Sequence, residues 1–166
     1  LAYEMDPQKH ILTAYARKAG VLDAQPSGAL SIYPNAVEHD IASRMLGTSQ
    51  KWAALHLGPG NVVGRTVPTP LLAAVEKHLK SQGWSVLWIQ AGAYSVHVLA
   101  AILQQCKLFV GSDSGPMHLA QAAQIPTVGI FGAVDPQNRL IPGVPYFRGV
   151  TAPEREVGGL GCHHVY

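Results

Sequence analysis

The sequence predicts an α/β fold, with a Rossmann-like parallel sheet of about five or six strands and helices on both faces. Short apolar runs with strand composition alternate along the chain with longer segments of helical periodicity. The clearest unit is a strand at 107–111, a helix at 116–124 and a second strand at 126–131. Parallel sheets are built from such strand, helix, strand units. The length of 166 residues suits one domain with its own core.

The N-terminal part of the chain is predicted to contain a helix and a short strand. Asp6 and Pro7 form a cap and first-turn pair and Gly20 supplies a stop, so 7–19 is predicted to be helical. Residues 29–33 have the alternation of a short edge strand.

A second helix is predicted to begin at Asn35, because Glu38 follows three residues later, as in a capping box. Val37, Ile41 and Met45 recur at a spacing of four residues. We expect these three side chains to bury one side of the helix.

The middle of the chain is predicted to hold two buried strands, each followed by a helix. The strands are 52–57 and 84–90, and the helices are 70–82 and 95–105. The second of these helices is almost uniformly apolar, which is typical of a buried helix. His56, near the end of the first strand, is interpreted as a satisfied core histidine.

Cys106 and Cys162 are the only cysteines. Two cysteines do not make a disulfide framework, which fits a reducing cytosol. Cys106 precedes a predicted strand and is expected to be a small core residue. Cys162 adjoins His163 and His164, but adjacent residues seldom point at one metal, so no metal or other cofactor is predicted.

The composition argues against several classes of protein. Apolar residues make up 48% of the chain and charged residues only 13%, so part of the surface is expected to be covered by a partner or a missing domain. A net charge of +2 with scattered basic residues argues against nucleic acid as a partner. No run of 18 apolar residues and no signal-peptide pattern is present. The protein is therefore predicted to be cytoplasmic, either free or peripheral to the inner membrane, and its start at Leu1 without Met suggests a fragment.

The segment 112–118, SDSGPMH, is the predicted functional site. Pro116 fits the first turn of a helix, and Ser114 is predicted to cap it. The N–H groups of that turn, with the positive end of the helix dipole, form a site for an anion. Gly115 allows a ligand to approach the backbone closely, and His118 can point at the same anion.

Asp113 lies at the carboxyl end of the predicted strand, where ligands bind in open α/β sheets. A carboxylate repels a phosphate, so Asp113 is expected either to face sugar hydroxyls or to order the loop. An Asp-Ser-Gly loop is also ordinary turn chemistry, and a histidine in a first helical turn is often only a cap partner. In this order and spacing, however, the residues favour a phosphate-bearing ligand.

The run 110–136, VGSDSGPMHLAQAAQIPTVGIFGAVDP, resembles the nucleotide-sugar site of the bacterial heptosyltransferases, glycosyltransferase family 9. That family's pattern is close to G-[ND]-[ST]-G-x-x-H-x-A, a short helix, P-T-[VI]-x-[LIV]-F-G and then D-P. Every landmark from Asp113 onward is present, and Ser112 is the one departure from the family's usual residue. The resemblance implies the C-terminal, donor-binding half of a two-domain GT-B enzyme that transfers a sugar from a nucleoside diphosphate, most simply ADP.

The same resemblance implies roles for individual residues. Asp113 would contact the donor sugar, the backbone amides of Ser114 and Gly115 would hold the pyrophosphate, and His118 would approach the phosphates. The implied donor-binding set also includes four further residues of the matched run: Pro116, Met117, Gly132 and Asp135.

A further candidate lies in the loop 58–68, where the family has a basic residue, two more residues and a proline. Arg65 and Pro68 match that order, with Arg where Lys is usual. A guanidinium there either holds a phosphate oxygen by a bidentate hydrogen bond or is a solvated loop arginine. Asn138 and Arg139, which follow the Asp-Pro turn, either reach a ligand or lie on the surface.

The resemblance also divides the chain into three parts. Residues 1–28 are interpreted as a linker helix region with its boundary at 25–28, and 29–150 as the Rossmann-like nucleotide-sugar-binding domain. Residues 151–166 are interpreted as an irregular C-terminal tail.

The chain departs from the family after the strand 84–90. The family there has a Glu that binds the nucleotide ribose, then a helix, a strand and a second helix, whereas this chain has only 91–94 before the helix 95–105. One strand and one helix are therefore missing, and no acid matches the ribose ligand.

Two functions remain open. The first is the donor half of a heptosyltransferase-like enzyme, completed by an N-terminal domain that binds a lipopolysaccharide-core or other acceptor. The catalytic base of the family lies in that other domain, so no catalytic residue is assigned to this chain. The second is a degenerate module that binds a nucleotide, a sugar phosphate or a protein partner without turnover.

Overall fold

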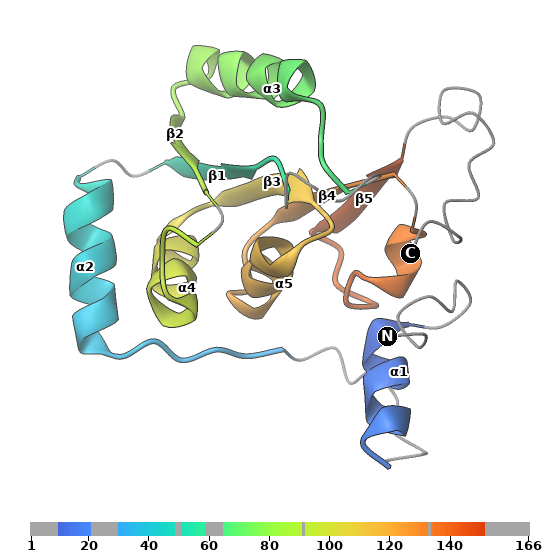
Figure 1. Cartoon of the computed structure of the whole chain (residues 1–166). Coiled ribbons are helices and arrows are strands. Elements are labelled where there is room, and N and C mark those ends of the chain that lie inside the picture. Colours follow the sequence, from blue (N-terminus) through green and yellow to red (C-terminus); the bar gives the residue numbers. More distant parts are fainter. Residues whose placement is uncertain are drawn as a thin grey trace.

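The computed structural model describes residues 10–20, 30–48, 51–58, 65–90, 92–132 and 134–151 (Figure 1). Its centre is one five-stranded sheet in the order β2-β1-β3-β4-β5, in which every neighbouring pair is parallel. The strands are β1 (Trp52–His56), β2 (Ser85–Trp88), β3 (Leu108–Ser112), β4 (Thr127–Phe131) and β5 (Phe147–Thr151). This arrangement confirms the predicted α/β class and the parallel sheet.

Helices cover both faces of the sheet (Figure 1). Helix α3 (Thr69–Ser81) lies on one face, and α2 (Ala36–Leu46), α4 (Val96–Gln105) and α5 (Gly115–Ala122) lie on the other. A short α1 (Ile11–Lys18) is tied to the far end of the domain, because its N-cap residue His10 places Nε2 3.0 Å from the Leu140 carbonyl oxygen. None of the helices that the structure describes is long and apolar enough to cross a membrane.

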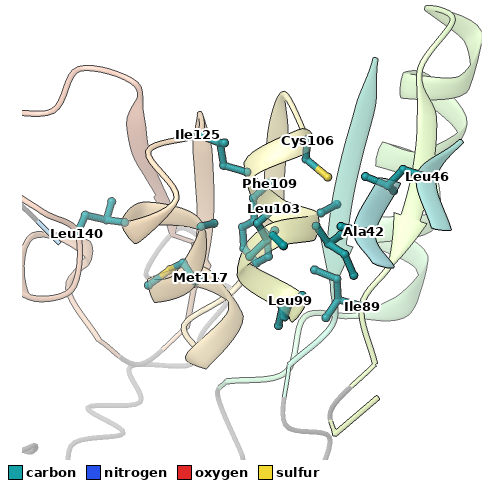
Figure 2. Packing of buried hydrophobic residues seen from close by; sticks show 14 of the residues in the cluster. Ala42, Leu46, Ile89, Leu99, Leu103, Cys106, Phe109, Met117, Ile125 and Leu140 are labelled. Atoms are coloured by element: carbon teal, nitrogen blue, oxygen red, sulfur yellow. The ribbon is translucent and has the colours of Figure 1, made fainter. Parts of the chain in front are cut away.

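The core consists of two apolar clusters, one on each face of the sheet. The cluster beneath α4 and α5 centres on Phe109, Ile102 and Leu103, all of which are fully buried (Figure 2). The smaller cluster beneath α3 joins Leu55 and Leu72 to residues of β2 and β3. The nearly uniform apolar composition of α4 follows from its place between the sheet, α2 and α5, which leaves it little contact with solvent.

Cys106 belongs to the larger cluster and is 1% exposed, as predicted. Burial raises the pKa of its thiol to about 12. The group is therefore a small apolar residue at neutral pH rather than a reactive thiolate.

The register of the sheet places the carboxyl ends of β1, β3 and β4 side by side. His56 of β1 lies opposite Gly111 of β3, and Ser112 of β3 lies opposite Ile130 of β4. The loops that follow β1, β3 and β4 therefore open at the same edge, where ligands bind in parallel α/β sheets.

The predicted strand at 29–33 is wrong for the part that the structure describes. Residues 30–35 run without strand pairing. Two side-chain amides take the place of a neighbouring strand: Gln104 donates to the Ile32 carbonyl at 3.1 Å, and Gln124 donates to the Leu30 carbonyl at 3.2 Å. Because these carbonyls are already satisfied, the segment needs no place in the sheet.

The capping box of α2 is confirmed, but its buried face is not the predicted one. Asn35 accepts from the backbone N–H groups of Val37 and Glu38, and the Glu38 carboxylate accepts from the Asn35 N–H. Val37, Ile41 and Met45 are 66%, 38% and 43% exposed. The helix instead turns two other residues into the core: Ala42 and Leu46.

Strand β5 was not predicted, since the last strand expected from the sequence was 126–131. Only Phe147 of this strand is buried, so the sequence carries no apolar alternation there. Pairing with β4 alone makes it a strand, at one edge of the sheet.

Strand β2 is the outermost strand on the side of the sheet opposite β5. The described part of the connection from β2 to α4 contains no further helix or strand. This agrees with the shortened middle seen in the sequence. The predicted cap at Asp6 and Pro7, the boundary at 25–28 and the tail 152–166 lie outside the described residues.

Candidate functional site

The candidate site lies where β3 ends and α5 begins. Ser114 occupies the N-cap position, but its hydroxyl donates to the Ser112 carbonyl at 3.1 Å and does not cap the helix, so the predicted side-chain cap is wrong. The equivalent hydroxyl of Ser95 does cap α4. Because Ser114 makes no side-chain cap, it leaves the first backbone N–H groups of α5 available to an anion.

The first residue of α5 leaves room for a ligand. Gly115 is exposed, and a Cβ placed on it would meet no atom within 4 Å. A bound group can therefore come close to the backbone amides at this position.

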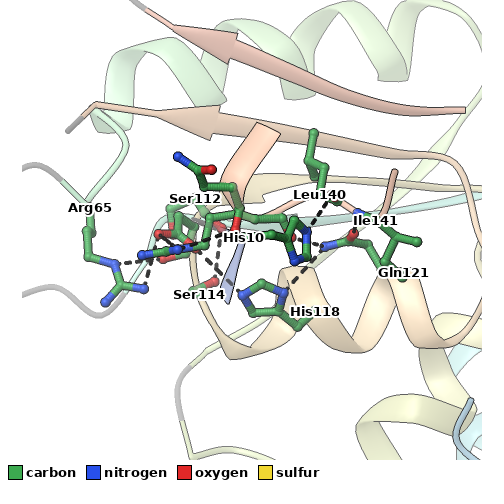
Figure 3. Close-up of polar contacts among 11 residues, drawn as sticks. His10, Arg65, Ser112, Ser114, His118, Gln121, Leu140 and Ile141 are labelled. Atoms are coloured by element: carbon green, nitrogen blue, oxygen red, sulfur yellow. Dashed lines mark hydrogen bonds and ion pairs between the residues drawn. The ribbon is translucent and has the colours of Figure 1, made fainter. Parts of the chain in front are cut away.

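Asp113 is the centre of the polar cluster at this site. Figure 3 labels Arg65, His118 and Gln121 of this cluster. The Asp113 carboxylate is 3% exposed and faces three basic side chains from three segments of the chain. Arg65 places Nη2 3.2 Å from Oδ2 and also donates from Nε to the Asp113 carbonyl oxygen at 3.1 Å. Arg139 places Nε 3.5 Å from Oδ2, and His118 places Nε2 3.7 Å from Oδ1.

The electrostatics of the cluster keep Asp113 ionised. Burial raises the pKa of this carboxyl, but the adjacent His118 ring and the charges of Arg65 and Arg139 outweigh burial and hold its pKa below the ordinary value. Two guanidinium groups face one carboxylate, so the cluster carries surplus positive charge beside the N-terminus of α5. This combination can hold an anionic ligand.

Gln121 is a member of the cluster that the sequence did not indicate. Its side chain is fully buried, with Oε1 accepting from the Ile141 N–H at 2.8 Å. Its Nε2 lies 3.5 Å from the Arg139 carbonyl oxygen and 3.4 Å from His118 Nδ1 (Figure 3). An amide that donates to Nδ1 favours the tautomer with its proton on Nε2, the atom that faces Asp113. The only signal in the sequence was a polar residue between Ala120 and Ala122 in an otherwise apolar turn.

The structure brings together three of the predicted residues, Asp113, His118 and Arg65. Arg139, for which a surface position was one alternative, joins them and is 7% exposed, so that alternative is wrong. Arg65 is paired with Asp113, which distinguishes it from a solvated loop arginine.

Other predicted residues lie differently. The Met117 side chain is fully buried in the core, so only its backbone can face the site, and its N–H donates to the Ser114 carbonyl. Asp135 is exposed and accepts from the Gln137 N–H at 2.8 Å, capping the 3-10 turn η2 (Pro136–Asn138). Pro116, in the first turn of α5, is half-buried. Gly132, which follows β4, is exposed.

A separate cavity of about 340 Å³ lies at the carboxyl ends of β1 and β2. His56 is 3% exposed beside it, with Nδ1 2.9 Å from the Ile89 carbonyl oxygen, which confirms the core histidine. No carboxylate occurs among the lining residues, which are His56, Leu57, Gly58, Trp88, Ile89 and Gln90.

Comparison with known proteins gives a consistent result. Residues 72–147 match the family model described as glycosyltransferase family 9 (heptosyltransferase). This match includes α4, β3, α5 and β4, and with them most of the polar cluster. The segment 72–147 is therefore similar to glycosyltransferase family 9.

Individual proteins similar to this chain agree with the family match. Lipopolysaccharide heptosyltransferase 3 of Escherichia coli is 40% identical over 45 residues, which are 27% of this chain and 13% of that protein. The crystal structure of a family 9 glycosyltransferase from Veillonella parvula DSM 2008 has a TM-score of 0.72 at 18% identity, over 93% of this chain and 52% of that one. The structure of E. coli ADP-heptose lipopolysaccharide heptosyltransferase II has a TM-score of 0.62 at 15% identity, over 81% and 50%. The chain therefore spans about half the length of these solved structures and shares their fold.

Proposed function

We propose that the chain is a glycosyltransferase family 9 domain that binds the donor of a heptosyltransferase-like reaction, a sugar linked to a nucleoside diphosphate of the ADP type. The observation that carries the proposal is the convergence of Arg65, Arg139 and His118 on buried Asp113 beside the uncapped start of α5. Surplus positive charge and open backbone amides suit a diphosphate. The diphosphate would lie over Gly115, where a ligand finds room.

The same groups suit the chemistry of sugar transfer. When the bond from sugar to diphosphate breaks, negative charge grows on the departing phosphate oxygens. Arg65, His118 and the first amides of α5 are placed to stabilise that charge, with no metal ion among the proposed groups. Asp113, held in its ionised form, would accept hydrogen bonds from the donor sugar or order the loop around it.

In this proposal, the acceptor-binding site and the catalytic base lie in a part of the enzyme outside this chain. The chain spans about half the length of the solved relatives. We propose that an N-terminal domain supplies the base and binds a lipopolysaccharide-core or other glycan acceptor, at the cytoplasmic side of the inner membrane.

A calorimetric titration of the chain with ADP, UDP, GDP and ADP-heptose tests the donor site. We expect one nucleotide to bind, and Asp113→Ala and His118→Ala each to weaken it about tenfold or more, since each removes a group that orders or contacts the phosphates. His97→Ala, at an exposed position of α4, is the matched control and should bind like the unmodified chain. Equal affinity of all variants would contradict the proposed site.

One observation favours a second function. The domain has no strand beyond β2 and no carboxylate lining the cavity at the ends of β1 and β2, within the part of the chain that the structure describes. A module that binds a diphosphate or a partner without sugar transfer fits these features. If inorganic pyrophosphate binds as tightly as every nucleotide tested, the nucleoside contributes nothing and this second function is favoured.

A further inference from the structure

We propose that Arg139 is the fixed counter-ion of Asp113, held in place by Gln121, and that this arrangement allows Arg65 to leave Asp113 and bind the diphosphate. The inference rests on the proposed function, because it assigns the two arginines of the donor site to different tasks. Arg139 would be a positioning residue, and Arg65 a residue that touches the ligand.

The two arginines pair with the same carboxylate oxygen but differ in their freedom to move. The Arg65 side chain is 33% exposed, whereas that of Arg139 is 7% exposed. An exposed arginine exchanges one anionic partner for another at little desolvation cost, and a buried one does not. Arg65 also follows β1 and lies beside the start of α5, where the ligand would sit (Figure 3).

Hydrogen bonds from α5 hold the backbone around Arg139 in place. Gln121, fully buried in α5, accepts from the Ile141 N–H and lies within hydrogen-bond reach of the Arg139 carbonyl. The Arg139 guanidinium also donates to the Asn138 carbonyl at 3.3 Å. These contacts fix the segment that carries Arg139 to the same helix that carries His118.

A counter-ion that stays in place has a clear consequence for binding. If Arg65 turned to a phosphate and no other cation remained, a buried carboxylate would face an anionic ligand, and it would have to take up a proton. Arg65, Arg139 and His118 are the charged or titratable groups within 4 Å of the Asp113 carboxylate in the described residues. With Arg139 present, Asp113 keeps its charge when Arg65 moves.

The test compares Arg139→Gln, Arg139→Lys, Arg65→Gln and the control Arg148→Gln, which removes an exposed arginine of β5. Binding of ADP and of inorganic pyrophosphate to the 166-residue chain is measured by calorimetry at pH 7 in two buffers of different ionisation enthalpy, which gives the protons taken up. Melting temperatures without ligand are measured from pH 2.5 to pH 8.

We expect Arg65→Gln to weaken ADP binding about tenfold or more, without additional proton uptake and with little change in melting temperature. Arg139→Gln should lower the melting temperature at pH 7 by several degrees, by an amount that shrinks as the pH falls and Asp113 becomes protonated. It should also make ADP binding take up a measurable fraction of a proton more than the unmodified chain does. Arg139→Lys keeps the charge, so its melting temperature and proton uptake should be close to those of the unmodified chain. A purely structural role of the arginine side chain would not be rescued by lysine in this way.

Several results would overturn the inference. The two arginines would not have different tasks if Arg139→Gln behaved like the control Arg148→Gln. The same holds if Arg65→Gln and Arg139→Gln lost equal melting temperature and took up equal numbers of protons. If Arg139→Gln does not fold, Arg139→Lys takes its place, and a larger proton uptake by Arg139→Lys than by the unmodified chain, despite the retained charge, would overturn the inference. Unchanged proton uptake in Gln121→Leu would remove Gln121 from the proposal.

The experiment also separates this inference from the proposed function. If the unmodified chain binds neither ADP nor pyrophosphate, the donor site and the movement of Arg65 both fail. The melting temperatures of Arg65→Gln and Arg139→Gln still decide which arginine is the counter-ion of Asp113. Binding of ADP with equal behaviour of the two variants would instead leave the donor site intact and refute the inference alone.

Discussion

Replacing Gly115 by Ala should make the domain more stable and a poorer binder of diphosphate. Gly115 is the first residue of α5, and a Cβ there meets no protein atom within 4 Å. The fold therefore has room for the methyl group. Since alanine is a better helix former than glycine, we expect a gain of about 0.5 kcal/mol in the free energy of unfolding, or about 1–2 °C in melting temperature.

The loss in binding follows from the same open space. A methyl group at Gly115 would occupy the volume through which a phosphate reaches the first amides of α5. Losing one hydrogen bond to a charged group costs about 1.5–3 kcal/mol, so the dissociation constant for ADP should rise by about 10- to 150-fold. Calorimetric titration and differential scanning calorimetry on the same preparations measure the two effects.

Gly58→Ala provides the contrast. Gly58 has φ +119°, and a Cβ there would lie 2.5 Å from the Arg65 carbonyl oxygen and 2.7 Å from Ser112 Oγ. We expect this variant to lose stability as well as binding. A Gly115→Ala chain that binds ADP with unchanged affinity, or that melts well below the unmodified chain, would refute the reasoning about the open helix start.

Three further outcomes are expected. Phe109→Ala leaves a cavity in the larger core cluster and should cost about 3–5 kcal/mol, or about 6–20 °C in melting temperature; a shift of a degree or two would contradict the central place of this ring. Asp113→Asn leaves Arg139 buried without its carboxylate and should cost about 3 kcal/mol near pH 7. Folding lowers the pKa of Asp113, so the ionised carboxylate stabilises the fold at pH values above its ordinary titration range. Urea titrations should therefore show the difference in stability between the unmodified chain and Asp113→Asn vanishing as the pH falls through the folded pKa. Cys106, with a pKa of about 12, should resist iodoacetamide at pH 8 in the folded chain, and peptide mass spectrometry that finds it alkylated before unfolding would contradict its burial.

The order of the elements could be predicted from the sequence because the signals that set it are local. Proline in the first turn of α5, the capping box at Asn35 and the apolar runs of β1, β3 and β4 each act over a few residues. The start of α2 and the bounds of α3 to α5 and of β1 to β4 differ from the predicted ones by only one or two residues, whereas α1 begins at Ile11, four residues after its predicted start. The family motif was equally local, since its landmarks lie within 110–136.

Two elements were misjudged because their state depends on distant neighbours. Residues 30–33 have strand composition, yet amides of Gln104 and Gln124 satisfy the carbonyls of this segment. Residues 147–151 lack the apolar alternation of a half-buried strand, yet pairing with β4 makes them a strand. In both cases hydrogen-bond partners far away in the sequence override local preference.

The sequence by itself determined the fold class, the start of α5 and the resemblance to glycosyltransferase family 9. Only the tertiary structure decided which charges meet there. Arg65, Asp113 and Arg139 come from three different loops, and the parallel sheet brings these loops together because the carboxyl ends of its strands share one edge. The burial that makes Arg139 differ from Arg65 has the same origin: it depends on Gln121 and the segment packed over it, not on the residue type.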